Sequence, residues 1–190
     1  MSKINEKGTM DRLSENIITD DQAFGKLVEK YKERIYSVVL RIAKNNEEAK
    51  DLAQEAFVKA YRNRNSFRGE AGFYTWVYRI AVNLALNYIN RNKERHSESI
   101  DDSTPIAASH TPTDLIEQSE LGEAISAAID QLPPRQRTVF ILRHYENKAH
   151  AEIAEILSIT EGAVKANYHQ AVLKLKTALG LYMTEGRRVS

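Results

Sequence analysis

Apolar residues recur every three to four positions through most of the chain, and no stretch shows the alternation expected of a strand. In the N-terminal half this spacing predicts one helix over 23–44, a second over 46–61 and a third over 73–91. Either Asp20 or Asp21 is expected to cap the first helix, because a carboxylate can accept hydrogen bonds from the free backbone N–H groups at a helix start.

The C-terminal half predicts four further helices, near 115–131, 134–145, 149–157 and 161–182. The first two are separated by Pro133 and Pro134, and proline suits the first turn of the helix that follows. Because every predicted element is a helix, the fold class expected is all-α.

The last two predicted helices are joined by Ser158, Ile159 and Thr160, a spacing typical of a helix-turn-helix motif. Ala154 is small where the two helices must cross closely, and Thr160 can cap the second helix. Many such turns have glycine at the position of Ser158. Serine costs more than glycine if the backbone is left-handed there.

A segment rich in Ser, Thr, Asp, Ala and Pro lies between the two helical regions and has almost nothing to bury, which is typical of an extended linker. We therefore expect an N-terminal extension (1–19), a first domain (20–95), a linker (96–114) and a second domain (115–185). Charge follows this division: 59–96 holds eight Lys/Arg and two acids, 97–123 seven acids and no Lys/Arg, and 135–190 nine Lys/Arg and five acids.

Composition excludes several classes of site. The 190 residues include no cysteine, so a disulfide framework, a thiolate zinc site and a cysteine nucleophile are absent. We find no phosphate loop, nucleophile elbow or paired metal-ligand spacing, and the five histidines are scattered. No run approaches the ~18 apolar residues of a membrane span, and no secretory signal is readable. We expect a cytoplasmic protein that is not an enzyme, with no catalytic residue, cofactor or metal.

The segment 67–83 carries five aromatic residues, two arginines, two glycines and Asn83 beside a predicted helix. Arginine neutralises phosphate, aromatic faces accept unstacked bases, and an amide can bond a base edge. These residues therefore indicate contact with opened nucleic acid. The alternative is that aromatic residues at helical spacing form the core of a helix bundle.

Asp51, Gln54 and Glu55 lie at positions i, i+3 and i+4 of a predicted helix, so they share one face. A solvated surface is the usual explanation for such a face. The functional alternative is a docking surface for a basic helix of another protein.

A helix-turn-helix presents the N-terminal half of its second helix to the major groove. The candidates for DNA contact are therefore Thr160, Glu161, Lys165, Ala166, His169 and Gln170. Nearby basic residues favour phosphate contact over a purely structural helix pair: Arg135, Arg137, Arg143 and Lys148.

Five motifs occur in order along the chain: DLAQEAF (51–57), SFRG (66–69), FYTWVYRIAVN (73–83), LPPRQRTVF (132–140) and EIAEIL (152–157). Together they closely resemble the extracytoplasmic-function sigma factors of bacterial RNA polymerase, the sigma-E-like group 4 of the sigma-70 family. The resemblance covers about 24–179. It implies a sigma-2 domain (20–95) that binds the polymerase clamp and opens the minus-10 element, and a sigma-4 domain (115–185) that reads the minus-35 element.

The resemblance also implies roles for individual residues. Asp51, Gln54 and Glu55 would dock on the beta-prime clamp, with the beta flap as a second contact on core polymerase. A pocket for a flipped base and its surroundings would be formed by Phe67, Arg68, Gly69, Phe73, Tyr74, Trp76, Arg79 and Asn83. The helix-turn-helix candidates would contact the minus-35 element. Further expected partners are promoter DNA and an anti-sigma factor, without membrane insertion or an obligate homo-oligomer.

Two departures from the family pattern concern the second domain. The recognition helix, usually arginine-rich, has no arginine over 166–172, and 146–150 replaces a turn that more commonly contains glycine. Two other functions stay open from the residues themselves. One is a stand-alone helix-turn-helix transcription regulator, and the other is a structural helical adaptor.

Overall fold

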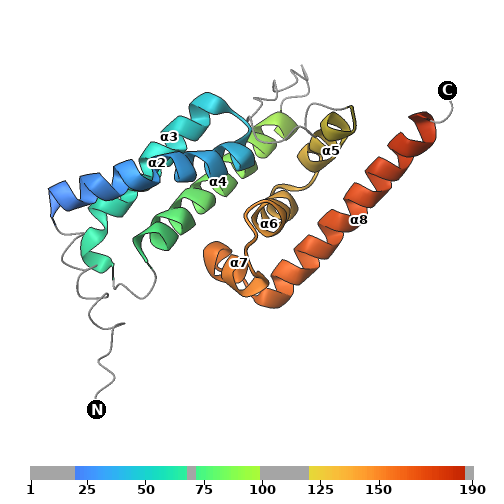
Figure 1. The fold of residues 1–190 in the computed structure, drawn as a ribbon. Coiled ribbons are helices and arrows are strands. Elements are labelled where there is room, and N and C mark those ends of the chain that lie inside the picture. The colour runs from blue at the N-terminus through green and yellow to red at the C-terminus, as the bar shows by residue number, and fades with distance from the viewer. Residues whose placement is uncertain (1–19, 68–71, 99–119, 187–190) are drawn as a thin grey trace, which may run out of the picture. The chain divides into compact units, whose positions relative to one another are not determined.

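The computed structural model describes residues 20–67, 72–98 and 120–186. All regular structure over these ranges is helical, which confirms the all-α class (Figure 1). The helices divide into two compact units, and the division falls between Asn87 and Tyr88, inside α4. The predicted N-terminal extension and the predicted linker from residue 99 onward lie outside the described residues.

The first unit is built from helices α2 (Asp21–Ala43) and α3 (Asn46–Arg62), the short 3-10 helix η1 (Arg64–Ser66) and the start of α4 (Phe73–Glu98). Each of the three predicted helices is present. However, α4 continues past the predicted end at residue 91, because no proline or glycine follows to stop it before Glu98.

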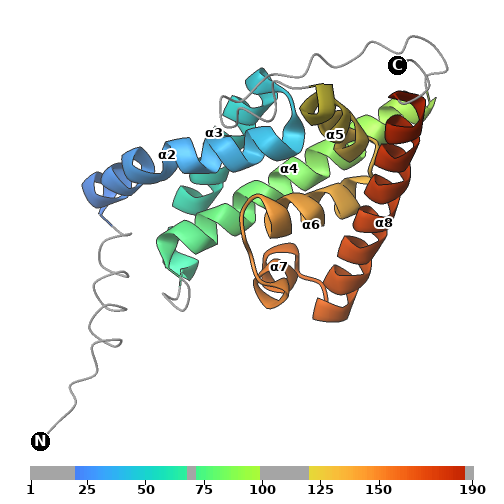
Figure 2. The same ribbon diagram turned by 45° about the vertical axis from the view of Figure 1, so that its right-hand side comes forward.

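Side-chain caps fix where α2 and α3 begin. The Asp20 carboxylate accepts a hydrogen bond from the Gln22 backbone N–H at 3.2 Å, which confirms the first of the two predicted caps. At the start of α3, the Asn45 side-chain oxygen accepts a hydrogen bond from the Glu48 backbone N–H at 3.1 Å. Lys44 ends α2 in a left-handed conformation, with φ of 58°. This short connection turns the chain back, so that α2 and α3 lie side by side (Figures 1 and 2).

The core of the first unit comes from the inward faces of these three helices. Phe24 of α2 makes edge-on contacts with Tyr61 of α3, at 5.2 Å between ring centroids, and with Phe73 of α4, at 5.4 Å. Such ring pairs add to the free energy gained by burying apolar area. Completely buried side chains surround them, among them Ile35, Val39, Ile42, Ala49, Ala56, Ala60, Val77, Ala81, Val82 and Ala85.

The second unit contains α5 (Glu120–Asp130), α6 (Pro134–His144), α7 (His150–Leu157) and α8 (Glu161–Gly186). Pro134 occupies the first turn of α6, as predicted. A cluster from α5, α6, α8 and the connection between α5 and α6 holds α5 and α6 against α8: Ile129, Leu132, Phe140, Ala171 and Leu175. The rings of Phe140 and Tyr168 stack within it at 6.1 Å.

The turn between α7 and α8 has helix-turn-helix geometry. Ser158 is left-handed, with φ of 53° and ψ of 48°. The Ile159 N–H bonds the Ala154 carbonyl at 3.0 Å, which closes α7. The Thr160 hydroxyl accepts a hydrogen bond from the Ala163 N–H at 3.1 Å, which confirms the predicted cap of α8.

Replacing Ser158 with glycine is expected to stabilise the protein. A left-handed conformation costs an L-residue roughly 1–2 kcal/mol, and glycine gives back about 0.5–1 kcal/mol in unfolded-state entropy. The net gain in unfolding free energy should be about 0.5–1 kcal/mol, measurable by urea denaturation. The matched control is Asn147→Gly, at a position with φ of 52°, where the gain should be smaller because asparagine tolerates this region better. A lower unfolding free energy in Ser158→Gly than in the unaltered protein would contradict this prediction.

Candidate functional site

The predicted docking residues Asp51, Gln54 and Glu55 all lie exposed on α3. On the opposite face of the helix, Leu52 and Ala56 are buried in the core. Glu55 pairs with Lys59 at 2.9 Å, one turn further along the same helix. The structure therefore presents these three polar side chains to solvent as one row.

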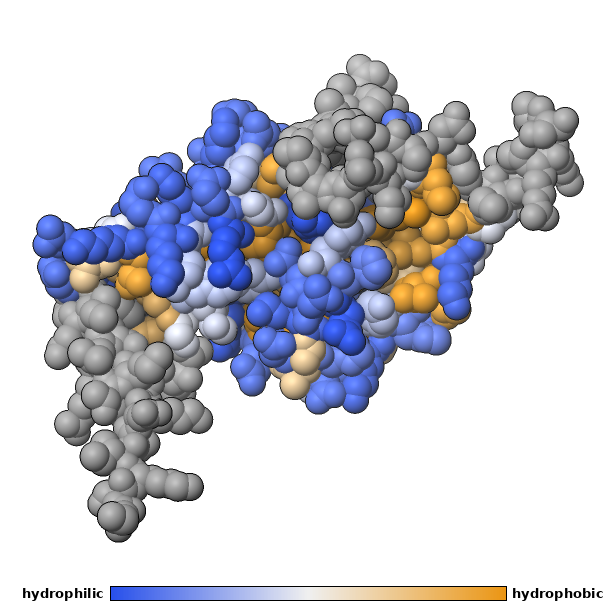
Figure 3. Space-filling view, viewed as in Figure 1, coloured by the Kyte–Doolittle hydropathy of each residue, from blue (hydrophilic) through white to orange (hydrophobic). Residues whose placement is uncertain are grey.

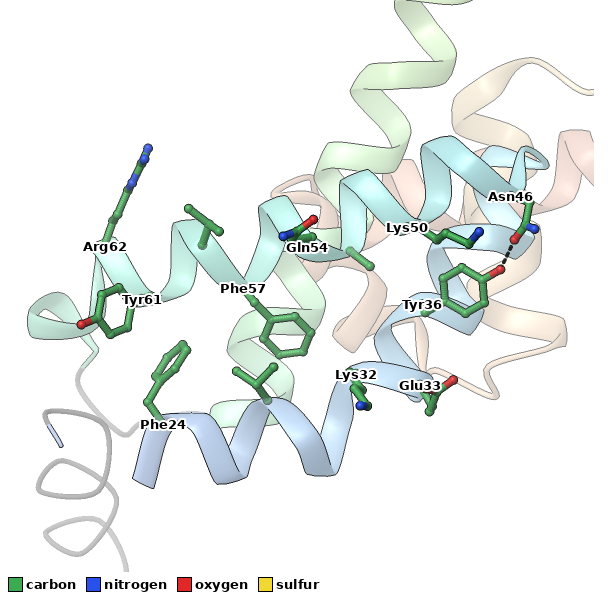
Figure 4. A pocket seen from close by; sticks show the side chains of 13 residues that line it. Phe24, Lys32, Glu33, Tyr36, Asn46, Lys50, Gln54, Phe57, Tyr61 and Arg62 are labelled. Atoms are coloured by element: carbon green, nitrogen blue, oxygen red, sulfur yellow. Dashed lines mark hydrogen bonds between the residues drawn. The ribbon is translucent and has the colours of Figure 1, made fainter. Parts of the chain in front are cut away.

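An open groove of about 850 Å³ lies beside this row, between α2 and α3 (Figure 4). Phe24 and Phe57 point into it from the two helices, and Gln54 lies along its edge. Val58 is 40% exposed next to Gln54, although it is apolar. Charged and polar side chains border the groove: Lys32, Glu33, Tyr36, Asn46, Lys50 and Arg62. At one end the Tyr36 hydroxyl donates a hydrogen bond to Asn46 Oδ1.

The groove was not predicted from the sequence, because it depends on how two helices pack. An apolar depression bordered by charge, next to a row of polar side chains, is typical of a surface that receives a helix of another protein.

The aromatic segment predicted to contact opened nucleic acid leads into α4. The rings of Phe67 and Trp76 lie 4.9 Å apart between centroids, and both are half-buried. Asn83 lies seven residues after Trp76 on the same face of α4, where its Nδ2 donates to the Arg79 carbonyl at 2.8 Å. The structure thus brings Phe67, Trp76, Arg79 and Asn83 to one side of the helix.

Two other residues predicted for this site, Phe73 and Tyr74, lie elsewhere in the structure. Phe73 is only 7% exposed and packs against Phe24, so its ring supports the site from beneath and is not available to a base. Tyr74 lies on the side of α4 that faces α2, within 5.2 Å of Tyr31. Arg68 and Gly69 are outside the described residues.

The six predicted contacts of the helix-turn-helix all occupy exposed positions at the start of α8: Thr160, Glu161, Lys165, Ala166, His169 and Gln170. Lys165, however, is paired with Glu161 at 2.8 Å. The hydrogen bond and charge of Lys165 lower the pKa of Glu161 from its ordinary value. The one cation of this surface is therefore already bound to a carboxylate on the same helix.

The basic residues near the helix-turn-helix differ in how far their side chains are exposed. Arg135 and Arg143 are exposed, and Lys148 is partly exposed, so all three stay candidates for phosphate contact. Arg137 has a side chain only 12% exposed, which lies 3.7 Å from Asp130, and burial lowers its pKa. Arg137 therefore stabilises the junction of α5 and α6, and the expectation that it faces phosphate is wrong.

A second groove, of about 550 Å³, lies between α5 and α8, where apolar side chains gather on the surface (Figure 3). It is lined mainly by Ala124, Ala127, Ala128 and Leu179. Leu121 nearby is 46% exposed. Sequence periodicity placed these residues on helices but gave no sign that their apolar face would stay uncovered.

No helix in the described ranges is both long and apolar enough to cross a membrane. Among the same residues, no group of three or more His, Asp or Glu side chains is placed to hold a metal ion.

Comparison with known proteins assigns the chain to a family. Residues 27–95 match the family model "Sigma-70 region 2", and residues 122–175 match "Sigma-70, region 4". The chain is 36% identical to the ECF RNA polymerase sigma factor SigW of Bacillus subtilis, over 84% of this chain and 90% of that protein. It is 34% identical to the ECF RNA polymerase sigma-E factor of Escherichia coli, over 80% of this chain and 84% of that protein.

Solved structures show the same fold. CnrH, in complex with the cytosolic domain of CnrY, superposes with a TM-score of 0.62 at 20% identity, covering 90% of this chain and 98% of that one. RpoE of Bartonella quintana, in complex with the anti-sigma factor NepR, gives 0.60 at 19% identity, covering 83% and 96%. The chain belongs to the extracytoplasmic-function sigma factors of the sigma-70 family, whose members direct promoter-specific transcription initiation.

Proposed function

We propose that two domains of the chain divide the work of promoter recognition. The domain over 20–95 docks on core polymerase through α3 and holds melted minus-10 DNA at the start of α4. The domain over 115–185 reads minus-35 DNA with α8, and residues 96–114 link the two. The protein acts in the cytoplasm as a non-catalytic specificity subunit. The observation that carries the proposal is the placement of Phe67, Trp76 and Asn83 on one side of α4.

The minus-10 step needs a base taken out of the duplex. Flipping a base costs a few kcal/mol, which stacking and hydrogen bonds in a pocket can offset. The half-buried rings of Phe67 and Trp76 offer apolar surface for such a base. Asn83 supplies an amide that can hydrogen-bond the edge of a base. To do so, the amide must exchange or share its present hydrogen bond to the Arg79 carbonyl.

Docking on core polymerase uses the exposed row on α3 and the groove beside it. A basic helix of the beta-prime clamp would meet Asp51 and Glu55 with its charges and Val58 with its apolar side chains. The groove between α5 and α8 is suited in the same way to an apolar helix of the beta flap. Two contacts joined by a linker raise the effective concentration of each domain at its site.

An anti-sigma factor would act by covering these surfaces. The solved relatives CnrH and RpoE were each captured with a second protein, CnrY and NepR. An apolar groove bordered by charge is costly to leave uncovered in a free protein. Occupation of the α2–α3 groove by an anti-sigma segment would exclude the clamp helix and keep this sigma factor inactive.

Footprinting of promoter DNA separates this proposal from a stand-alone transcription regulator. A sigma factor should protect promoter DNA only together with core polymerase, because neither of its domains binds strongly alone. A stand-alone regulator should protect its site without polymerase. A clear footprint from the free protein would support the regulator, and no footprint in either state would support a structural adaptor.

The ion pair at the start of α8 leads to a prediction about minus-35 binding. Glu161→Gln should strengthen binding, because it removes a negative charge near phosphate and frees Lys165. One additional phosphate contact should steepen the dependence of log K on log salt by about 0.9. Binding of the holoenzyme to a promoter fragment over a range of salt measures this slope. Glu47→Gln is the matched control, because it removes an exposed carboxylate that pairs with Lys50 at 2.8 Å in the other unit, and it should leave the slope unchanged. An unchanged slope in Glu161→Gln would contradict the prediction.

A further inference from the structure

Arg64 of the short helix η1 makes contacts with both α2 and α3. Its guanidinium lies over the ring of Tyr61, near the end of α3, 4.0 Å from the centroid. Its Nη1 donates a hydrogen bond to the Tyr61 carbonyl at 2.9 Å, and its Nη2 lies 3.9 Å from Asp21 Oδ1 at the start of α2. The Tyr61 hydroxyl donates to the same Asp21 oxygen at 2.7 Å. Asp21, Tyr61 and Arg64 therefore form one closed set of contacts, the η1 clasp, which joins three elements.

The η1 clasp holds Arg64 in one place mainly through Tyr61. The approach of Arg64 to Asp21 contributes little by itself, because the Asp21 side chain is 73% exposed. The Arg64 side chain, in contrast, is only 27% exposed, and a planar guanidinium can stack on a ring and donate to a carbonyl at the same time. Asp21 in turn fixes the Tyr61 ring, and this hydrogen bond raises the pKa of the Tyr61 hydroxyl, which stays a donor at neutral pH.

Backbone hydrogen bonds carry this placement to Phe67, the first residue after η1. The Phe67 N–H bonds the Arg64 carbonyl at 3.2 Å, and the Ser66 N–H bonds the Asn63 carbonyl at 2.9 Å. Among the described residues no side chain caps η1, and a 3-10 helix of three residues has too few hydrogen bonds to be stable alone. The position of the Phe67 ring, 4.9 Å from the ring of Trp76, therefore depends on the contacts that Arg64 makes.

We propose that Arg64 is a positioning residue of the minus-10 pocket, which holds the Phe67 ring against Trp76 through the η1 clasp. In this role Arg64 contacts no DNA. It lowers the cost of capturing a flipped base, because the pocket is formed before the base arrives. Arg64 lies between the motifs at 51–57 and 66–69, so the sequence motifs did not indicate this role. The inference rests on the proposed function, because it concerns the proposed pocket.

Fluorescence of the free, full-length protein tests the placement of Phe67. Trp76 is the only tryptophan of the chain, so its emission reports on its contact with Phe67. Arg64→Ala should release the Phe67 ring and make Trp76 more accessible to quenching by acrylamide. Asn63→Ala is the matched control, because it also removes a side-chain hydrogen bond to the end of α3, at the Lys59 carbonyl, but takes no part in the η1 clasp. Its quenching should equal that of the unaltered protein.

Promoter opening by the holoenzyme tests the consequence. Arg64→Ala should slow opening about tenfold, the scale of one lost contact between a base and an aromatic ring, and permanganate reactivity of the melted strand measures the rate. The salt slope of promoter binding should stay unchanged, because no phosphate contact is lost. Arg64→Lys should restore only part of the rate, since an ammonium can bond the Tyr61 carbonyl but cannot stack flat on the ring.

A second variant covers the case in which Arg64→Ala does not fold, which thermal unfolding reveals. Asp21→Ala changes an exposed side chain and frees the Tyr61 ring, so it should increase Trp76 quenching and slow opening in the same direction. If Arg64→Ala is unfolded, Asp21→Ala decides alone.

Three results would overturn the positioning role. These are unchanged quenching of Trp76, an unchanged opening rate in a variant with increased quenching, and a salt slope that falls by about 0.9, which would make Arg64 a phosphate contact. In each case the unaltered holoenzyme still opens the promoter, and the proposed function stands. If the unaltered holoenzyme opens no promoter, the proposed function itself fails.

Discussion

Reversing the charges of Asp51 and Glu55 together is expected to abolish association with core polymerase. Both carboxylates are exposed on one row of α3, so the double change to arginine should leave the fold intact. The two new arginines would face the positive charges of a basic clamp helix, where the unaltered protein has two carboxylates. Like charges brought together at an interface cost several kcal/mol, which corresponds to at least about a 100-fold loss of affinity. A pull-down of core polymerase, followed by titration, measures the loss.

The control for this variant is Glu29→Arg, a charge reversal on an exposed position of α2 that does not line the groove. It should retain association with core polymerase. Circular dichroism and thermal unfolding check that both variants are folded. If the double variant still binds core polymerase with its original affinity, the row on α3 is an ordinary solvated surface.

Removing the amide of Asn83 is expected to slow promoter opening. Asn83→Ala eliminates the group proposed to bond the flipped base, and such a contact is worth about 1–3 kcal/mol, so opening should slow roughly tenfold or more. Preference for the minus-10 sequence should relax, while association with core polymerase stays unchanged. Permanganate reactivity of thymines in the melted strand, followed over time, measures the opening rate.

Asn63→Ala provides a closely matched control. Its Nδ2 donates to the Lys59 carbonyl at 2.9 Å, the same bond to the residue four positions earlier that Asn83 makes with Arg79. It therefore loses the same local contact without touching the proposed pocket. Equal reactivity of the melted strand in Asn83→Ala and the unaltered protein would exclude the role of Asn83.

Local signals in the sequence predicted the helices and their starts. Asp20 and Thr160 both cap the helices that follow them, because capping depends on one short side chain and the next few backbone N–H groups. Whether Ser158 is left-handed was left open by the sequence, because its side chain gives no preference for that region, and the structure shows that it is. The end of α4 was placed too early, since helix ends without glycine or proline carry a weak signal.

The candidate site was predictable in its residues but not in their surroundings. Phe73 and Arg137 belong to residue types suited to nucleic acid, yet the structure buries Phe73 and leaves only 12% of the Arg137 side chain exposed. Packing alone decides which aromatic or basic side chain stays at the surface. The pairing of Glu161 with Lys165 was readable from their i, i+4 spacing. The groove between α2 and α3 and the approach of Arg34 to Tyr74 could not be predicted from local patterns, because both bring together residues far apart in the sequence.

This protein gives core RNA polymerase the ability to start transcription at chosen promoters. The most direct measurement is sequencing of transcripts made in vitro from genomic DNA by sigma-free core polymerase, with and without the protein. Defined start sites, each preceded by a shared pair of minus-35 and minus-10 sequences, are expected only when the protein is present. Association with core polymerase without any defined start, or identical transcripts in both reactions, would contradict it.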